Sequence, residues 1–212
     1  MSTPEGVLAF WFGPPARSED ELLAKLQRWF AGGAALDAEI ELLFGADVEA
    51  ALAGALDPWA QTPEGVLALV LVLDQFPRSI HRGSPRAFEG DAKAMELVED
   101  AHARGLDRAL RWEQRHFLLT PYLHAEHAPA PDRAQDLFRR CLAECPPLNR
   151  VAFAAGLEQA EKYRAVLLRF GRFPHRNEAL GRVSTPDEIE FLKDWEQQAR
   201  PAVMERKGAN PR

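Results

Sequence analysis

The hydrophobic pattern of this chain consists of apolar stretches that open on helix-capping residues and close near Gly or Pro. The most direct sign is a near repeat, in which Thr3-Pro4-Glu5-Gly6-Val7-Leu8-Ala9 recurs as Thr62-Pro63-Glu64-Gly65-Val66-Leu67-Ala68. Thr185-Pro186-Asp187-Glu188 repeats the opening of both. Threonine can accept hydrogen bonds from free backbone amides, proline is tolerated at the first helical position, and an acid there favours the positive end of the helix dipole. All three segments therefore predict helix starts.

The same signals predict the other helix boundaries and leave little room for strands. Starts are expected at Ser18, Asp37, Pro85 or Asp91, Asp107, Asp132 and Asn149, and stops at Gly105, Cys145-Pro146-Pro147 and Phe170. Periodicity alone would allow a buried strand over Val66–Leu73, but the Thr-Pro-Glu entry and the continuation to Phe76 favour a buried helix. Because the chain has no Asn-Gly hairpin signal, it predicts an all-α fold, a compact array of antiparallel helices with roughly eight to ten members.

Length and cysteine content fit one soluble domain. The chain has 212 residues, and single domains commonly run to about 100–200 residues, so one domain is expected and two small domains are the alternative. We expect this domain to cover residues 1–200 and the polar, Pro- and Gly-containing segment 201–212 to be a frayed tail. Only Cys141 and Cys145 are present. Reduced thiols are a simpler interpretation of them than a redox pair, which predicts a cytoplasmic protein.

Charge and hydropathy argue against two classes of partner. The net charge is −6, and no run of Lys or Arg stands apart from compensating acids, whereas proteins that bind nucleic acid usually carry a clear basic face. The longest apolar runs, Val66–Leu73 and Val7–Phe12, are far shorter than the roughly 20 residues of a membrane helix. No basic segment precedes Val7, as a secretory signal would need. The sequence therefore predicts neither a nucleic-acid partner nor a membrane.

Two similar turns carry the most conspicuous polar chemistry. They read Asp74-Gln75-Phe76-Pro77-Arg78-Ser79-Ile80-His81-Arg82 and Arg169-Phe170-Gly171-Arg172-Phe173-Pro174-His175-Arg176-Asn177. Each follows an apolar stretch and places arginines and a histidine around a Phe-Pro pair, which predicts a helix end. The two turns either build one shared polar site or form two independent helix caps.

Asp74 follows eight consecutive apolar residues, so its carboxylate is expected to be dry and to need a cation or several donors. Arg78 lies four residues further on, and Arg172 or Arg176 would reach Asp74 if the two turns meet. A buried ion pair that fixes helix ends is one interpretation, and a catalytic group is the other.

Arg164 shares a helical stripe with Phe153, Leu157, Ala160 and Leu167. An unpaired charge buried there would cost several kcal/mol, so Arg164 is expected to find a carboxylate or to lie beside a wet cleft. The alternative is an arginine that snorkels at the edge of the core.

The segment around His124 is a candidate for acid–base chemistry. Histidine changes charge near neutral pH, and Glu126 is close enough in sequence to tune it. The alternative is a histidine with satisfied hydrogen bonds at a helix packing site, which is commoner than a catalytic one. A metal site built from His124, Glu126 and His127 is not favoured, because the spacing is not that of a His-Glu-x-x-His zinc helix. The chain also lacks a Gly-rich phosphate loop or a dinucleotide fingerprint, so neither a metal nor a cofactor is predicted.

His175-Arg176-Asn177, with Arg172 three residues before the histidine, supplies donors suited to a carboxylate or phosphate group. Arginine can bind such groups through two parallel hydrogen bonds. The alternative is that these cations satisfy the free carbonyls and negative dipole end of the preceding helix.

Several of these motifs together resemble one bacterial family, the domain of unknown function 924. The resemblance is carried by Val7–Gly13, Leu73–Arg78, Arg82–Phe88, Phe170–Asn177, Leu180-Gly181-Arg182 and Ser184-Thr185-Pro186, and it runs from about Val7 to Leu192. It implies an all-α fold similar to tetratricopeptide-repeat-like superhelical arrays, without an established activity.

The resemblance also marks polar positions that match the family pattern: Asp74, Gln75, Arg78, Arg82, Asp91, His124, Glu126, Arg172, His175, Arg176, Asn177 and Arg182. The chain departs from the pattern at Ser79, where the family usually has Asn, and at Ala125, which replaces a Ser. Tyr163 stands where a His commonly precedes the arginine equivalent to Arg164. That departure counts against any chemistry that needs this His, and it leaves an arginine-lined pocket intact.

We therefore expect a cytosolic binding protein whose pocket accepts an anionic group of a small molecule or peptide. The residues expected to line it are Asp74, Arg78, Arg82, His124, Glu126, Arg164, Arg172, His175, Arg176 and Asn177. One alternative is a hydrolase or transferase that uses His124 and Glu126 as acid–base groups with arginines as charge stabilisers. The other is a purely structural or protein-interaction module.

Overall fold

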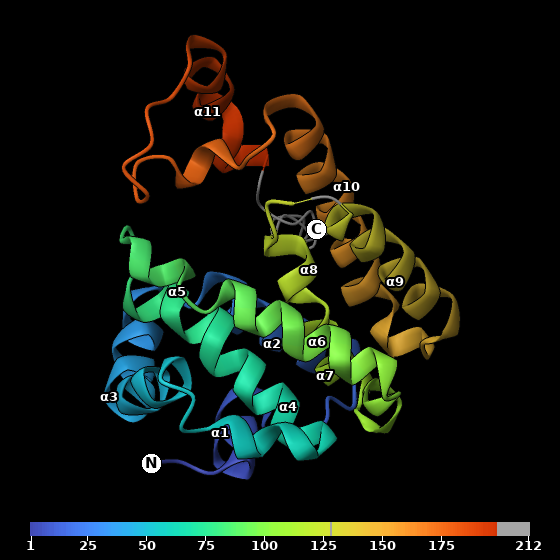
Figure 1. Cartoon of the computed structure of the whole chain (residues 1–212). Coiled ribbons are helices and arrows are strands. Elements are labelled where there is room, and N and C mark those ends of the chain that lie inside the picture. The colour runs from blue at the N-terminus through green and yellow to red at the C-terminus, as the bar shows by residue number, and fades with distance from the viewer. Residues whose placement is uncertain (128, 199–212) are drawn as a thin grey trace, which may run out of the picture. The chain divides into compact units, whose positions relative to one another are not determined.

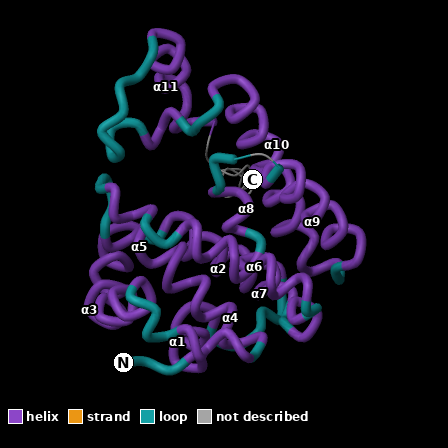
Figure 2. The backbone as a smooth tube through the Cα atoms, in the orientation of Figure 1, coloured by secondary structure: helices purple, strands orange, loops and turns teal. Residues whose placement is uncertain are grey.

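The computed structural model describes residues 1–127 and 129–198, and over these ranges it consists of helices and turns without a strand (Figures 1 and 2). The all-α prediction is thereby confirmed. The chain divides into two compact units, Met1–Ala125 and Glu126–Arg212. Whether these behave as one domain over residues 1–200 stays a prediction, and the segment 201–212 lies outside the described residues.

The first unit contains α1 to α8, and short 3₁₀ helices join α3 to α4, α5 to α6 and α6 to α7. Their bounds are α1 (Pro4–Phe12), α2 (Glu19–Ala31), α3 (Gly33–Leu52), α4 (Pro63–Val70), α5 (Phe76–Ile80), α6 (Asp91–Ala103), α7 (Trp112–Leu118) and α8 (Thr120–His124). The predicted caps of α1, α2 and α4 are confirmed, because the hydroxyls of Thr3, Ser18 and Thr62 accept from the backbone amides of Gly6, Glu21 and Gly65.

Three boundaries of the first unit differ from the prediction. Asp37 does not begin a helix but lies inside α3, because the chain turns earlier, where Gly33 adopts a φ of 69°. Asp107 lies in a 3₁₀ turn, and the next helix begins at Trp112. The first Phe-Pro pair does not end the helical path. Pro77 lies in the first turn of α5, where its missing amide hydrogen is tolerated.

The core of the first unit surrounds α4. Every residue from Gly65 to Val70 is buried, and α4 packs against α1, α6 and α7. Aromatic rings from α1, α2, α5 and α7 fill the adjoining space, with Trp11 5.6 Å from Phe76 and 5.5 Å from Phe117 between ring centroids. A helix that is apolar on all sides requires such a surrounding, which confirms the prediction of a buried helix over Val66–Leu73.

The second unit is built on a helical hairpin of α9 (Ala130–Glu144) and α10 (Arg150–Phe170), which pack against each other. The predicted stop at Cys145-Pro146-Pro147 is confirmed. α10 ends where Gly171 adopts a left-handed φ of 69° and donates to the Leu167 carbonyl. After the second Phe-Pro turn, α11 (Pro186–Gln198) begins behind Thr185, as predicted.

Protonation of buried His116 is expected to destabilise the first unit at low pH. The imidazole packs between Phe30 and Phe117, and burial lowers its pKa from 6.5 to about 4. The unfolded chain therefore takes up a proton near pH 6.5 and the folded chain only near pH 4. We expect the free energy of unfolding to fall by up to about 3 kcal/mol between pH 6.5 and pH 4 from this group.

Denaturant unfolding at pH 7.5 and at pH 4.5 checks this expectation, with His116→Gln as the variant that cannot take up the proton. The loss between the two pH values should be smaller in His116→Gln than in wild type. An equal loss in both proteins would show that His116 does not carry it.

No helix among residues 1–127 and 129–198 is long and apolar enough to cross a membrane.

Candidate functional site

Asp74 lies on an irregular helical turn three residues before Pro77. Between α4 and α5, residues Leu71–Gln75 form a π-helical segment, in which the Phe76 amide donates to the Leu71 carbonyl. Pro77 has no amide hydrogen, so the Leu73 carbonyl cannot receive the usual bond from four residues ahead. Single π-helical turns of this kind often occur at functional sites.

Four side chains converge on the Asp74 carboxylate, whose side chain is fully buried. Oδ1 lies 2.6 Å from Nδ1 of His124 and 3.1 Å from Nη1 of Arg78. Oδ2 accepts from Nε2 of Gln75 at 2.6 Å and lies 3.1 Å from Oγ1 of Thr120. Each carboxylate oxygen therefore has two partners, which is what a dry carboxylate needs. The prediction that Arg78 pairs with Asp74 is confirmed.

Arg78 connects Asp74 to a second acid, Asp91. The guanidinium also lies 2.8 Å from Oδ1 and 2.9 Å from Oδ2 of Asp91 and donates to the Asp74 carbonyl at 2.6 Å. Asp91 begins α6, directly after Gly90. A Cβ on Gly90 would lie only 2.1 Å from the Leu73 carbonyl oxygen. Glycine therefore lets the start of α6 approach the π-helical segment and brings Asp91 to Arg78.

The charges in this cluster set the protonation of Asp74. Burial by itself raises the pKa of Asp74, but the Arg78 guanidinium, His124 and the Gln75 amide outweigh it and hold the pKa well below its usual range. Asp74 is thus ionised and can only accept hydrogen bonds, so Nδ1 of His124 carries the proton between them.

His124 is held in its neutral form. Burial lowers the pKa of the imidazole, and the charge of Arg78 lowers it further, which together outweigh the opposite effect of Asp74. With Nδ1 bonded to Asp74, Nε2 is the ring nitrogen that can take up a proton. The side chain is 17% exposed, so this pair combines a buried carboxylate with a partly accessible imidazole.

In the second unit, Glu126 holds the backbone of the second Phe-Pro turn. Its Oε1 accepts from the Phe173 amide at 2.6 Å, and Arg182 donates to both of its oxygens, at 2.9 and 3.1 Å. Arg182 also donates to the Phe173 carbonyl at 3.0 Å. Burial raises the pKa of Glu126, but the Arg182 hydrogen bond and the Phe173 amide outweigh it and lower the pKa. The hydrogen bonds of Glu126 therefore fix the backbone conformation of this turn.

Glu188 fixes the other side of the same turn. Arg172 donates to both of its oxygens, at 2.7 and 2.8 Å, and Asn177 donates to it at 3.3 Å. The Thr185 amide donates at 2.7 Å, which completes a reciprocal cap at the start of α11. The Arg172 hydrogen bond is the main reason that the pKa of Glu188 is lowered to about 2. Arg172 and Asn177 are thus committed to holding the turn.

The remaining predicted site residues also contact other side chains, through ion pairs or aromatic rings. Arg82 pairs with Asp37 at 2.8 Å, and Arg164 pairs with Asp132 at 2.5 Å. Arg164 thus finds a carboxylate, but its side chain is 38% exposed, as expected for an arginine that snorkels at the edge of the core. His175 stacks on Trp195 with ring centroids 5.0 Å apart and an interplanar angle of 8°. The Arg176 guanidinium lies over the Phe173 ring, 4.9 Å from its centroid.

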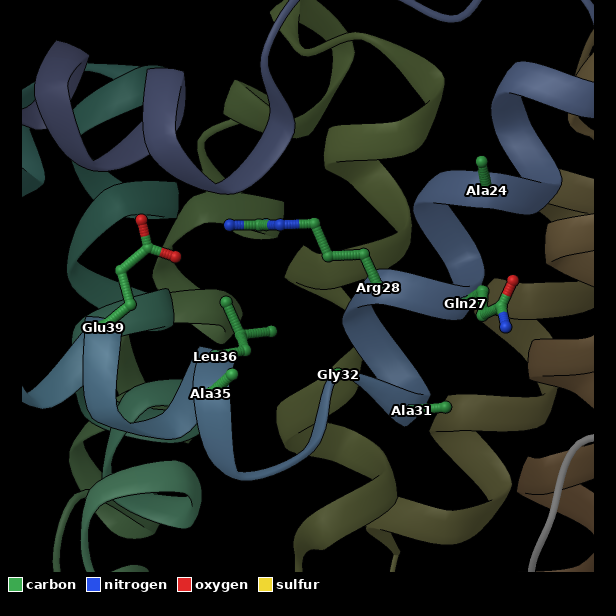
Figure 3. Close-up of a pocket in the computed structure, with 8 residues that line it drawn as sticks. All are labelled: Ala24, Gln27, Arg28, Ala31, Gly32, Ala35, Leu36 and Glu39. Atoms are coloured by element: carbon green, nitrogen blue, oxygen red, sulfur yellow. The ribbon is translucent and has the colours of Figure 1, made fainter.

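A shallow groove opens elsewhere in the first unit, between the end of α2 and the start of α3 (Figure 3). It has a volume of about 410 Å³. Alanines and Gly32 make up much of its lining, and Arg28 and Glu39 extend from the two helices beside it. None of the predicted site residues lines this groove.

In the described part of the chain, no cluster of three or more His, Cys, Asp or Glu side chains is placed to hold a metal ion.

Sequence reasoning from the residues alone did not find Thr120, Asp91 or Glu188. Thr120 had a signal, because it lies four residues before His124 and so shares a helical face with it. Glu188 had one in the Thr-x-x-Glu spacing from Thr185, which is typical of a capping box. Asp91 entered only through the family resemblance, since its approach to Arg78 depends on the folded position of Gly90.

The sequence of the chain matches a known family. The family model described as "Bacterial protein of unknown function (DUF924)" matches residues 7–196.

The chain belongs to this family.

A solved structure, "Structure of Protein of Unknown Function ATU0120 from Agrobacterium tumefaciens", is 34% identical to the chain and has a TM-score of 0.75. The likeness covers 90% of this chain and 97% of that chain. Among curated proteins, none matches the chain. The family resemblance noted in the sequence is thus confirmed, and the likeness to tetratricopeptide-repeat arrays stays a prediction.

Proposed function

We propose that this DUF924 member is a hydrolase or transferase in which His124 acts as general base. The observation that carries the proposal is the bond between buried Asp74 and Nδ1 of His124, at 2.6 Å. A carboxylate in this position orients the imidazole and stabilises the cation that forms when Nε2 takes a proton from a reacting group. The sequence pointed to Glu126 as the partner of His124, and Asp74 supplies that role.

The charge balance supports this function over an arginine-lined pocket for an anion. Arg78 lies against Asp74 and Asp91, and Arg172 lies against Glu188. An anionic ligand would have to compete with carboxylates that already make close hydrogen bonds to these guanidinium groups. Within the first unit, the Arg78 guanidinium lies against the carboxylates of both Asp74 and Asp91, so an anion near His124 would also meet these two acids.

A screen of activated esters, amides and phosphoesters tests the proposal. Wild type is compared with His124→Gln and with His127→Gln, an exposed histidine three residues further along the chain. We expect turnover in wild type and in His127→Gln, and a loss of at least about 100-fold in His124→Gln, the range typical of a general base. Circular dichroism of each variant confirms that it is folded.

The pH dependence of that turnover is a second readout. Because the pKa of His124 is lowered, the base stays unprotonated to a lower pH than an ordinary histidine, and the acid limb of the profile should have its midpoint below pH 6.5. Equal turnover in wild type and His124→Gln would remove the proposal.

Binding of an anionic group without turnover remains a second candidate. It is supported by the placement of His175 and Arg176 on one short 3₁₀ turn, Pro174–Arg176. A thermal-shift screen against anionic metabolites addresses it, because a ligand specific for the folded state raises apparent stability. A hit that raises the melting temperature of wild type and not of Arg176→Ala would support binding there. A hit that shifts both equally would count against it.

A further inference from the structure

Helix α8 contacts Asp74 at two points, one turn apart. Thr120 and His124 are four residues apart and therefore share one face of the helix. Oγ1 of Thr120 lies 3.1 Å from Oδ2 of Asp74, while Nδ1 of His124 lies 2.6 Å from Oδ1. Thr120 is buried, with 3% of its surface exposed. One carboxylate thus contacts the first and the last residue of α8.

Gln75 completes the environment of Oδ2. Its Nε2 donates to Oδ2 at 2.6 Å and to Oγ1 of Thr120 at 3.2 Å. The Thr120 hydroxyl also lies 2.8 Å from the Phe117 carbonyl. Its single proton has two acceptors, of which the ionised carboxylate is the stronger. Asp74, Gln75 and Thr120 therefore form a closed set of hydrogen bonds on the side of the carboxylate opposite to His124.

We infer that Thr120 and Gln75 are positioning residues for His124. By occupying Oδ2, they leave Oδ1 as the acceptor for the imidazole, which fixes the ring with its proton on Nδ1 and its lone pair on Nε2. Neither residue touches a reacting group in this arrangement, and both act through Asp74. The inference rests on the proposed function for its effect on turnover, whereas the position of the proton is a property of the folded protein without substrate.

Loss of either donor has a defined physical consequence. An Oδ2 with only one of its two donors left would be a buried acceptor with an unmet hydrogen bond, and the carboxylate would gain by rotating to share the partners of Oδ1. The geometry at Nδ1 would then loosen, and the imidazole would populate both neutral tautomers. A base with the proton on Nε2 cannot accept a second proton there without first losing it.

Nitrogen NMR of ¹⁵N-histidine-labelled protein at pH 7.5 tests the inference. The chain has 6 histidines, and His124→Gln identifies the resonances of His124 by their loss. We expect one protonated and one unprotonated ring nitrogen in wild type and in Thr120→Ser. In Thr120→Val and in Gln75→Met the two resonances should move toward each other. Val98→Ala, which removes two methyl groups at a fully buried position of α6, controls for a general loss of stability.

Unchanged His124 resonances in both Thr120→Val and Gln75→Met would overturn the inference, as would an equal movement in Val98→Ala. Once a substrate is known, Thr120→Val is expected to lower turnover by about threefold to tenfold, the value of one lost hydrogen bond, and Thr120→Ser to restore it. If the resonances behave as expected while His124→Gln keeps full turnover, the positioning role stands and the proposed function fails.

Discussion

Replacement of Asp74 by alanine is expected to lower the free energy of unfolding by about 3–5 kcal/mol, the range found when one partner of a buried charge pair is removed. The Asp74 side chain is fully buried and has partners in Arg78, His124, Gln75 and Thr120. Removal of the carboxylate leaves these donors in a site that water reaches poorly. Equilibrium unfolding in urea at pH 7.5 measures the change.

Asp91→Ala is the matched control, because Asp91 binds the same guanidinium but is 17% exposed. Arg78 keeps its contact with Asp74 in this variant, so the expected loss is smaller, roughly 1 kcal/mol. If Asp91→Ala destabilised the protein as much as Asp74→Ala, burial of Asp74 would not be what makes the cluster important.

Gly90→Ala is expected to destabilise the first unit by about 3 kcal/mol, at the upper end of the range for overpacking. The new Cβ would lie 2.1 Å from the Leu73 oxygen and 2.9 Å from the Leu73 carbonyl carbon. These are backbone atoms of the π-helical segment, so no side chain can swing away to make room. The clash with Leu73 can be removed only if the start of α6 moves, and Asp91 would move with it.

Gly45→Ala, in the same unit, is expected to stabilise the protein. Gly45 lies inside α3, and a Cβ there would meet nothing within 4 Å. The substitution removes a flexible residue from a helix, so we expect a gain of about 0.5–1 kcal/mol. Thermal unfolding of both variants checks the pair, and a Gly90→Ala protein as stable as Gly45→Ala would refute the close approach of α6 to Leu73.

The helix starts could be predicted from the sequence because neighbouring residues determine a helix cap. Thr3, Thr62 and Thr185 each precede a proline and an acid, and these neighbours alone are enough to specify a cap. Asp37 misled the prediction because an aspartate suits a helix cap as well as an ion pair. Its carboxylate goes to Arg82, 45 residues away in sequence, and no local pattern carries that information.

The candidate site was predictable only in part, for the same reason. Burial of Asp74 follows from the apolar run before it, and Arg78 is one helical turn away, so this pair could be predicted. His124 was singled out for its chemistry, but its carboxylate partner lies 50 residues earlier. Nothing in the spacing distinguishes Asp74 from the nearer Glu126, which the fold uses to hold the Phe173 backbone.

A pH titration of the His124 imidazole by NMR tests the central claim most directly. The claim is that burial and Arg78 keep this ring neutral at physiological pH while Nδ1 donates its proton to Asp74, so that the next proton is taken up at Nε2. The account predicts a midpoint below pH 6.5 for wild type. A midpoint above pH 6.5 would mean that the attraction of Asp74 for the charged ring outweighs burial and Arg78, which contradicts the account.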